Sequence, residues 1–225
     1  MIFITLTNNG YLDYTRNCIT SLKKCSYEGN LDCFCIDDEC YDNLKKTHKF
    51  VHKLENNEKI DFCPNYGRHK WTNIVFQKFY AIYQCLLNYD YVLFTDGDIV
   101  FKNKDFINYC YDNINDNDLL IQNNKQTNDN CNDLCTGFMF IKSNETTLNI
   151  FNPDNIIKNH GHCDDQWYVN IMKKHLKYKL FPLELFPNGK FFIDNYENIN
   201  PYIIHFNWLV GNQKKEKMIK YNVWY

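Results

Sequence analysis

Hydrophobic and polar positions follow two kinds of pattern along the chain, one typical of strands and one of helices. Short apolar runs that end in polar or small residues predict strands, at residues 2–7, 31–36, 49–54, 91–95, 119–122, 138–141 and 202–206. Apolar residues three or four positions apart predict helices, at residues 11–24, 71–89, 103–113, 164–175 and from 213 onward. Because strands and helices alternate through the first half, we predict an α/β fold with a mixed, mostly parallel sheet flanked by helices on both faces.

The length and hydrophobic content of the chain bound its number of domains. The chain has 225 residues, of which 44% are hydrophobic. This is long enough for one well-buried domain and short for two. We therefore expect a single domain over residues 1–225. The Asn- and Asp-rich stretch 123–133 is the best candidate for a long mobile loop.

Polar residues directly follow three of the predicted strands. Asn8, Asp37 and Asp96 each occupy such a position. In a parallel sheet covered by helices, ligands bind outside the carboxyl ends of the strands. We therefore expect these three residues to lie at the ligand-binding edge of the sheet.

The segment Asp96-Gly97-Asp98 is the strongest chemical signal in the sequence. Residues i and i+2 of an extended segment point the same way, so the two carboxylates converge unless a positive charge lies between them. A hard divalent cation meets that requirement, and Gly97 permits close approach of a ligand. A tight surface turn is the alternative interpretation, but apolar residues on both sides of the segment favour the metal site.

Lys78 and His205 each allow a structural and a functional interpretation. Lys78 lies on the apolar side of its predicted helix, so its ammonium either reaches an anion or extends past the apolar residues to solvent. His205 follows a strand-like run, where a lone histidine is usually a hydrogen-bonded structural residue but can also be a metal ligand.

The start of the predicted helix at 164–175 carries two carboxylates and an amide, from Asp164, Asp165 and Gln166. Capping and the helix dipole explain one of the carboxylates, but they do not explain Gln166. We expect Asp165 and Gln166 to face a substrate, and Asp164 either to cap the helix or to bind substrate. Tyr11 is equally compatible with stacking on a ligand and with packing in the core.

Composition and cysteine usage exclude several classes of protein. The net charge is −2 and no basic stripe stands out, so we expect no nucleic-acid partner. The 11 Cys are scattered, which argues against a disulfide framework. A zinc site built from Cys131, Cys135, His160, His162 and Cys163 is disfavoured because no second regular pair follows the first.

The sequence also lacks the signals of membrane insertion and secretion. No signal peptide and no membrane span are evident, so we expect a reducing, cytoplasmic location. The frequent Asn, Lys and Ile are typical of an AT-rich genome. That composition suits an AT-rich microbe or a large DNA virus. For a virus, the location would be the host cytoplasm or the virion.

With these motifs in view, the chain resembles the nucleotide-diphospho-sugar transferases of the GT-A fold, in the short branch related to plant cell-wall and glycogenin-like transferases. The likeness extends from about Thr5 to Trp224. It rests on an ordered series of segments, namely TLTN with Tyr11, QKFYAIYQCLL, FTDGDIVF, CTGFMFIKS, DDQWYVN and HFNWLVGNQKK. The last segment departs from the glycogenin-like pattern, because His205 and Gly211 are farther apart, and it leaves open whether Lys214 or Lys215 binds diphosphate.

The resemblance implies a glycosyltransferase that moves a sugar from a nucleotide-diphosphate donor, most often a UDP-sugar, to a hydroxyl of a glycan, protein or small-molecule acceptor. It implies Mn²⁺ or Mg²⁺ as cofactor and favours retention of anomeric configuration over inversion. It assigns residues 1–101 to nucleotide binding and 102–225 to the sugar and acceptor. The implied metal ligands are Asp96, Asp98 and His205, and the implied catalytic residues are Asp164, Asp165 and Gln166. The implied donor-binding residues are Thr5, Thr7, Asn8, Tyr11, Asp37, Lys78, Asp96, Gly97, Gly137, Gly211, Lys214 and Lys215.

Two other functions compete with this interpretation. A phosphohydrolase of the haloacid-dehalogenase kind also places two Asp, two residues apart, after an apolar strand. That motif normally opens its domain, whereas here several predicted elements precede Asp96. A catalytically inert nucleotide-sugar-binding module is the second alternative, although all the carboxylates of the motifs are present.

Overall fold

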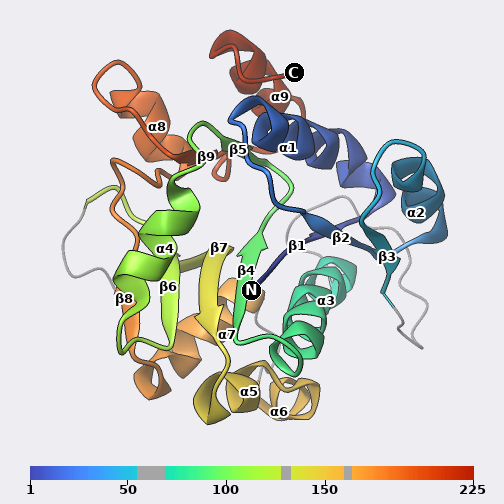
Figure 1. Ribbon diagram of the computed structural model, residues 1–225, viewed down its shortest axis with the longest axis vertical. Coiled ribbons are helices and arrows are strands. Elements are labelled where there is room, and N and C mark those ends of the chain that lie inside the picture. The colour runs from blue at the N-terminus through green and yellow to red at the C-terminus, as the bar shows by residue number, and fades with distance from the viewer. Residues whose placement is uncertain (55–68, 128–132, 160–163) are drawn as a thin grey trace.

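The computed structural model describes residues 1–54, 69–127, 133–159 and 164–225. Its main feature is a seven-stranded sheet in the order β3-β2-β1-β4-β7-β6-β8 (Figure 1). The strands are β1 Ile2–Thr7, β2 Asp32–Cys35, β3 Val51–Lys53, β4 Tyr91–Thr95, β6 Leu119–Asn123, β7 Leu134–Lys142 and β8 Tyr178–Leu180. Only β7 is antiparallel to its neighbours, and the other pairings are parallel. The predicted fold class is therefore confirmed.

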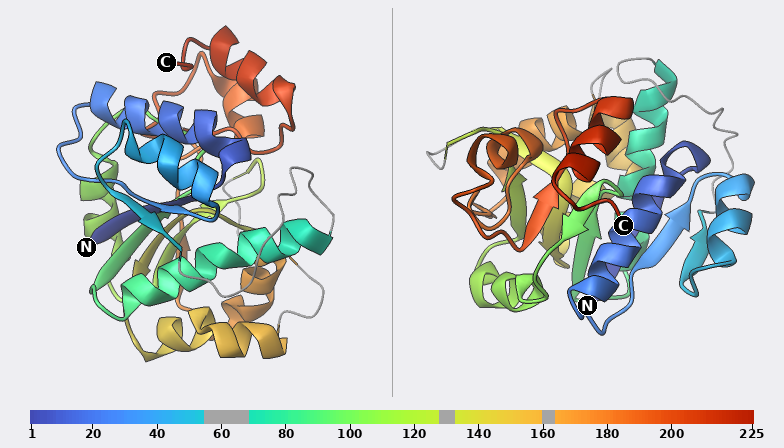
Figure 2. Two further views of the ribbon diagram at one scale, coloured as in Figure 1. Left: turned by 90° about the vertical axis from the view of Figure 1, so that its right-hand side faces the viewer. Right: turned by 90° about the horizontal axis from the view of Figure 1, so that it is seen from above.

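Helices cover both faces of this sheet, as Figure 2 shows. On one face lie α1 Leu12–Lys24, α2 Asp38–Lys45 and α4 Phe106–Ile114. On the other lie α3 His69–Leu86, α5 Glu145–Phe151, α6 Pro153–Asn159 and α7 Asp165–Met172. Alternate residues of the central strands face opposite cores: Leu93 joins the first cluster, whereas Val92 and Phe94 join the second.

A second, two-stranded sheet stands beside the carboxyl end of β4. It pairs β5 Ile99–Phe101 with β9 Ile203–His205 in antiparallel register. Together with α8 Gly189–Asn195 and α9 Asn212–Lys220, it forms a third, smaller apolar cluster around Val100, Ile204 and Phe206. This small sheet brings the C-terminal part of the chain back to the end of β4.

The predicted strands and helices correspond to observed elements, with shifted bounds. The prediction did not include β5, β8, α2, α5, α6 or α8, nor the short 3₁₀ helix η1 Asn9–Tyr11. The helix predicted at 164–175 is divided into α7 and the 3₁₀ helix η2 Lys173–His175. The strand predicted at 138–141 is longer than expected and begins at Leu134. Part of the predicted loop 123–133, residues 128–132, lies outside the described residues.

The ends of the parallel strands meet at one edge, as expected. The backbone N–H of Asn9, just beyond β1, donates to Oδ2 of Asp37, just beyond β2, at 2.9 Å. Asp96 follows β4, which pairs with β1 on the side away from β2. The three predicted strand-end residues therefore share the carboxyl edge of the sheet.

Two further expectations concern membranes and thiols. Among the helices that the structure describes, none has the length and apolar character needed to cross a membrane. The cysteines of the described segments are free thiols, most of them buried. Of the disfavoured zinc ligands, only Cys135 is described; the other four positions, 131, 160, 162 and 163, lie outside the described residues.

Candidate active site

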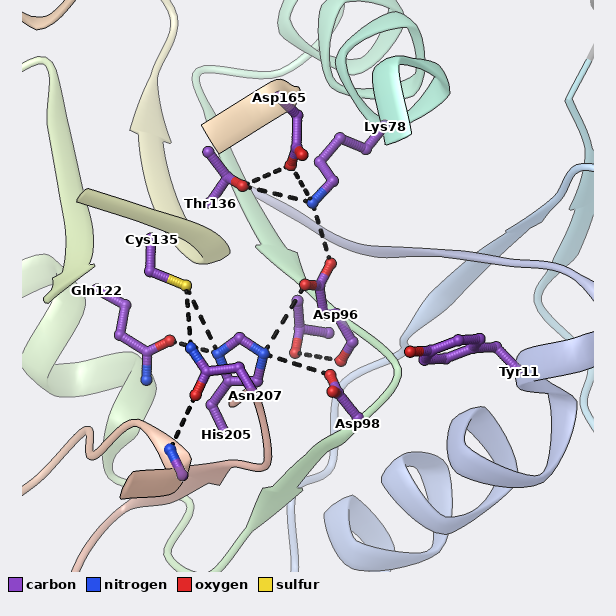
Figure 3. A network of polar contacts seen from close by, with 12 residues as sticks. Tyr11, Lys78, Asp96, Asp98, Gln122, Cys135, Thr136, Asp165, His205 and Asn207 are labelled. Carbon is purple, nitrogen blue, oxygen red and sulfur yellow. Dashed lines mark hydrogen bonds and ion pairs between the residues drawn. The ribbon is translucent and has the colours of Figure 1, made fainter. Parts of the chain in front are cut away.

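Two carboxylates and an imidazole converge at the carboxyl end of β4 (Figure 3). One ligand atom from each of Asp96, Asp98 and His205 lies within 4.8 Å of the other two. Nε2 of His205 is 3.3 Å from Oδ1 of Asp98 and 3.8 Å from Oδ2 of Asp96. The side chains of Asp98 and His205 are almost fully buried, whereas Asp96 is one-third exposed. The cluster therefore opens to solvent on the Asp96 side.

Strand register explains how residues so far apart in sequence come together. Ile99 of β5 is the direct partner of His205 of β9, so the ladder places the histidine beside the residue that follows Asp98. The N–H of Phe206 also donates to the carbonyl of Asp98 at 3.2 Å. The end of β4 is held by a backbone bond from Asp96 to the carbonyl of Gly137 at 2.7 Å.

Gly137 leaves the space that the imidazole of His205 occupies. A Cβ atom on this residue would lie 2.1 Å from Cε1 of His205 and 2.8 Å from Oδ2 of Asp96. Real atoms do not approach so closely, so any larger residue would displace the ring. Resemblance alone assigned Gly137 to donor binding; in the structure it lies directly against two of the three candidate metal ligands.

Lys214 lies on the other side of Asp98. Its ammonium donates to Oδ2 of Asp98 and lies 3.4 Å from the hydroxyl of Tyr11. The side chain of Lys214 is buried, whereas Lys215 is exposed and its ammonium lies over the ring of Trp224. Of the two lysines left open by the sequence, the structure brings Lys214 to the acidic cluster. Tyr11 is 41% exposed, so it does not pack in the core.

Lys78 joins the cluster to the start of α7. Its buried ammonium lies 2.7 Å from Oδ2 of Asp165 and 3.3 Å from Oδ1 of Asp96. Thr136 donates to the same oxygen of Asp165 at 2.6 Å. Lys78 therefore reaches anions instead of solvent, and these anions are carboxylates of the protein.

The charges of the cluster shift its proton affinities. Burial alone would raise the pKa of Asp98, but Lys214 and His205 hold it far below its usual range. Burial raises the pKa of Asp96, against the lowering effect of Lys78. Burial alone would lower the pKa of His205, but Asp98 outweighs it and raises the pKa to about 10. Without a metal, His205 is thus held as a cation between two carboxylates.

Behind His205 lies a layer of polar side chains that the sequence analysis did not include in the site. Nδ1 of His205 is 2.6 Å from Oε1 of Gln122 and 3.8 Å from Sγ of Cys135. Asn207 donates to the same sulfur at 3.6 Å. Gln122 is the last residue of the strand predicted at 119–122 and is fully buried. In the sequence, one polar residue at the end of an apolar run is no specific signal for this role.

Four of the remaining predicted residues lie at the starts of helices. At the start of α7, Asp164 caps the helix by accepting from the N–H of Trp167 at 2.7 Å, and burial raises its pKa. Gln166 is half-buried beside it. At the ends of β1 and β2, Asn8 caps η1 and Asp37 caps α2.

The other predicted residues are two threonines in β1 and two glycines. Thr5 and Thr7 are buried in β1, and Thr7 accepts from Thr15 at 2.8 Å. Gly97 packs against Thr15, where a Cβ would lie 2.7 Å from its hydroxyl. Gly211 precedes α9 with a φ of 55°, a conformation that favours glycine.

The donor set suits a hard divalent cation. Two carboxylates and one imidazole are few ligands for Mg²⁺ or Mn²⁺, which commonly complete their coordination with water and substrate phosphate oxygens. The open side at Asp96 leaves room for such oxygens. The positive charges of Lys78 and Lys214 flank the same space, which would favour an anionic ligand there.

Comparison with known proteins identifies the family of the chain. A family model described as nucleotide-diphospho-sugar transferase matches residues 30–219. The UDP-galactose:fucoside alpha-3-galactosyltransferase of Dictyostelium discoideum is 28% identical over 282 aligned positions, which cover 99% of this chain. The same alignment covers 42% of that relative, so the chain spans less than half its length.

Solved structures of glycosyltransferases share the fold. The galactosyltransferase LgtC, in complex with donor and acceptor sugar analogues, matches with a TM-score of 0.58 and 10% identity over 92% of this chain and 87% of its own. Mouse xyloside xylosyltransferase 1 matches with a TM-score of 0.60 and 11% identity over 94% of this chain and 98% of its own. At such low identity these likenesses establish the architecture, which is the GT-A arrangement.

Proposed function

Because the chain belongs to the nucleotide-diphospho-sugar transferase family, we propose that it transfers a sugar from a nucleotide-diphosphate donor to an acceptor hydroxyl, with a divalent cation held by Asp96, Asp98 and His205. The convergence of these three ligand atoms within 4.8 Å carries the proposal. When bound, Mn²⁺ or Mg²⁺ would act as a Lewis acid that neutralises the leaving diphosphate.

The two buried lysines supply the remaining positive charge. Lys214 would turn from Asp98 towards the diphosphate and stabilise the negative charge that develops on it. Lys78 is held by Asp165 and Asp96, so its ammonium is fixed in orientation before substrate arrives. Lys78 and Asp165 would in this way position the sugar between them and the metal site.

The proposal extends to the donor nucleotide and its binding residues. The Dictyostelium relative carries UDP-galactose in its name, which makes a UDP-sugar the first donor class to test. Thr5, Thr7, Asn8, Tyr11 and Asp37 would contact the nucleoside, because they lie at or near the carboxyl ends of β1 and β2. Residues 1–101 would thus bind the nucleotide and residues 102–225 the sugar and the acceptor.

We propose retention of anomeric configuration. An inverting enzyme needs a carboxylate base at the acceptor, and the two carboxylates expected there already have partners. Asp165 is engaged by Lys78 and Thr136, and Asp164 caps α7. A retaining enzyme has less need of such a base, since the leaving phosphate can take the acceptor proton. The anomeric proton coupling of the product in NMR distinguishes the two outcomes.

A donor panel tests the proposal and its two alternatives. The protein is incubated with Mn²⁺ and several nucleotide sugars, and release of nucleoside diphosphate is measured. Donor-selective release that is lost in Asp98→Asn but kept in Asp38→Asn supports the transferase, because the Asp38 carboxylate is exposed and pairs with Lys53. Release of inorganic phosphate from simple phosphoesters would instead identify a hydrolase. Metal-dependent binding without turnover, with varied acceptors present, would identify an inert binding module.

A further inference from the structure

The side-chain amide of Gln122 is held in one orientation by the backbone. Its Nε2 atom lies 3.1 Å from the carbonyl oxygens of both Phe186 and Pro187, so the NH₂ group donates to both. A flipped amide would point Oε1 at two other acceptors, which is unfavourable for a fully buried group. Oε1 is therefore left facing the imidazole of His205.

The position of Gln122 in the sheet explains why it points there. Gln122 belongs to β6, and the register of β6 against β7 shifts between Ile121 and Gln122. Such an irregularity changes the direction of the side chains that follow it. Gln122 pairs with Cys135 of β7 after the shift, and Cys135 also lies beside His205.

An acceptor at this place determines which ring nitrogen of His205 carries the proton. Oε1 of Gln122 is 2.6 Å from Nδ1, so Nδ1 must be the protonated nitrogen and the donor. In the neutral ring, Nε2 then has a lone pair, and it faces Asp98 at 3.3 Å and Asp96 at 3.8 Å. A lone pair aimed at two carboxylates is stable only with a metal cation between them; without the metal, a proton on Nε2 takes that place and the ring is a cation.

We propose that Gln122 is a positioning residue of the metal site, which holds the neutral tautomer of His205 that presents its Nε2 lone pair to a divalent cation. This inference rests on the proposed function, because it needs a metal between Asp96, Asp98 and His205. Such a residue orients a metal-bound histidine and raises its basicity, and its loss typically weakens metal binding about 10- to 100-fold.

Two substitutions separate the acceptor of the amide from its donors. Gln122→Glu keeps an acceptor for Nδ1–H and loses the donors to Phe186 and Pro187, whereas Gln122→Met loses both. Asn188→Ala is the control. The side chain of Asn188 stabilises the same region by donating to the carbonyls of Asn123 and Lys125, but it is not the hydrogen-bond acceptor for Nδ1 of His205. Binding of Mn²⁺ alone is measured on the full chain by the electron paramagnetic resonance signal of free Mn²⁺. Thermal unfolding in EDTA reports the stability of each variant.

The proposal expects Gln122→Met to bind Mn²⁺ about 10- to 100-fold more weakly, and Gln122→Glu and Asn188→Ala to bind within about threefold of wild type. Equal Mn²⁺ binding by Gln122→Met and wild type overturns the proposal. An equal loss of binding in all three variants also overturns it, because it would mean that Gln122 only stabilises the backbone around Phe186 and Pro187. A wild-type chain that does not bind Mn²⁺, even with UDP present, would instead reject the metal-dependent function itself.

If Gln122→Met does not fold, NMR of the wild-type protein tests the proposal by showing which ring nitrogen of His205 carries the proton. In ¹⁵N-labelled wild-type protein with Mg²⁺, the imidazole resonances of His205 are assigned by comparison with His205→Gln. A proton on Nδ1 agrees with the proposal. A proton on Nε2 contradicts it.

Discussion

The ammonium of Lys214 donates to Oδ2 of Asp98, and this carboxylate is one of the two that would bind the metal. Both side chains are almost fully buried, with 6% exposure each. In the absence of donor, Lys214 and a divalent cation therefore compete for the same carboxylate. Donor binding would remove this competition by offering Lys214 a diphosphate.

Lys214→Met should have opposite effects on metal binding and turnover. Mn²⁺ alone should bind about tenfold more tightly, which corresponds to the loss of about 1.4 kcal/mol of competing interaction. Turnover should fall by about 10² or more, because a charge that stabilises the leaving group is lost. Calorimetric Mn²⁺ titration and nucleoside diphosphate release measure the two effects. Lys215→Met is the matched control, since Lys215 is exposed over Trp224 and both quantities should stay near wild type.

Breaking the buried pair of Lys78 and Asp165 should destabilise the fold more than removing it. Lys78→Met leaves Asp165 buried at 3% exposure without its ammonium and should cost about 3–5 kcal/mol. The double variant Lys78→Met with Asp165→Asn should recover part of that loss, because it leaves no unpaired charge at Asp165. Urea denaturation of wild type, Lys78→Met, Asp165→Asn and the double variant gives the coupling free energy between the two side chains. Additive losses in the double variant would show that the pair does not act as a unit.

Gly137→Ala should disturb the candidate metal site more than the rest of the fold. The new Cβ would meet Cε1 of His205 at 2.1 Å, so the ring must move away from Asp96 and Asp98. We expect a loss of about 1–3 kcal/mol in stability and at least tenfold weaker Mn²⁺ binding. Unchanged Mn²⁺ affinity would mean that His205 has more freedom than the structure indicates.

The metal-free protein should lose stability as the pH rises from 6.5. Burial lowers and Asp98 raises the pKa of His205, with a net rise from 6.5 to about 10. Because the folded pKa is above the unfolded one, the stabilising contribution is complete below pH 6.5 and declines as the pH rises towards 10. Thermal unfolding in EDTA between pH 6.5 and 8.5 measures this decline. His205→Gln should remove it, and a decline of the same size in that variant would assign the effect to other groups.

The sequence could predict the parts of the site that depend on local pattern. Asp96 and Asp98 follow an apolar strand directly, so two carboxylates at its end could be expected from the pattern. The segment is not extended as predicted, however: β4 ends at Thr95, and Gly97 and Asp98 form a turn that leads into β5. His205 is different, because its place beside Asp98 depends on the pairing of Ile99 with His205, two short strands far apart in the chain. Only the resemblance to a family connected His205 with the acidic pair, and β5 itself, at three residues, has too short a pattern to detect.

Gln122 and Asp37 show where the sequence pattern was insufficient. The apolar run before Gln122 predicted a strand, but the shift in register that aims the side chain at His205 has no signature in a single sequence. Asp37 was expected to lie at the end of a strand, which it does, and its contact with the donor stays a prediction. Its carboxylate caps α2 and accepts from Asn9 as well, and α2 was missed because its polar residues resemble a loop.

The small sheet of β5 and β9 also has a consequence for the order of events during synthesis. The seven-stranded sheet is complete once the chain has been made as far as Leu180, the last residue of β8. His205 and Lys214 emerge later, so all strands of the sheet are made before the candidate metal site has its histidine and its lysine. A cation would therefore bind to a framework whose main sheet precedes it in the order of synthesis, and nascent chains that end before β9 would lack His205, one of the three candidate ligands.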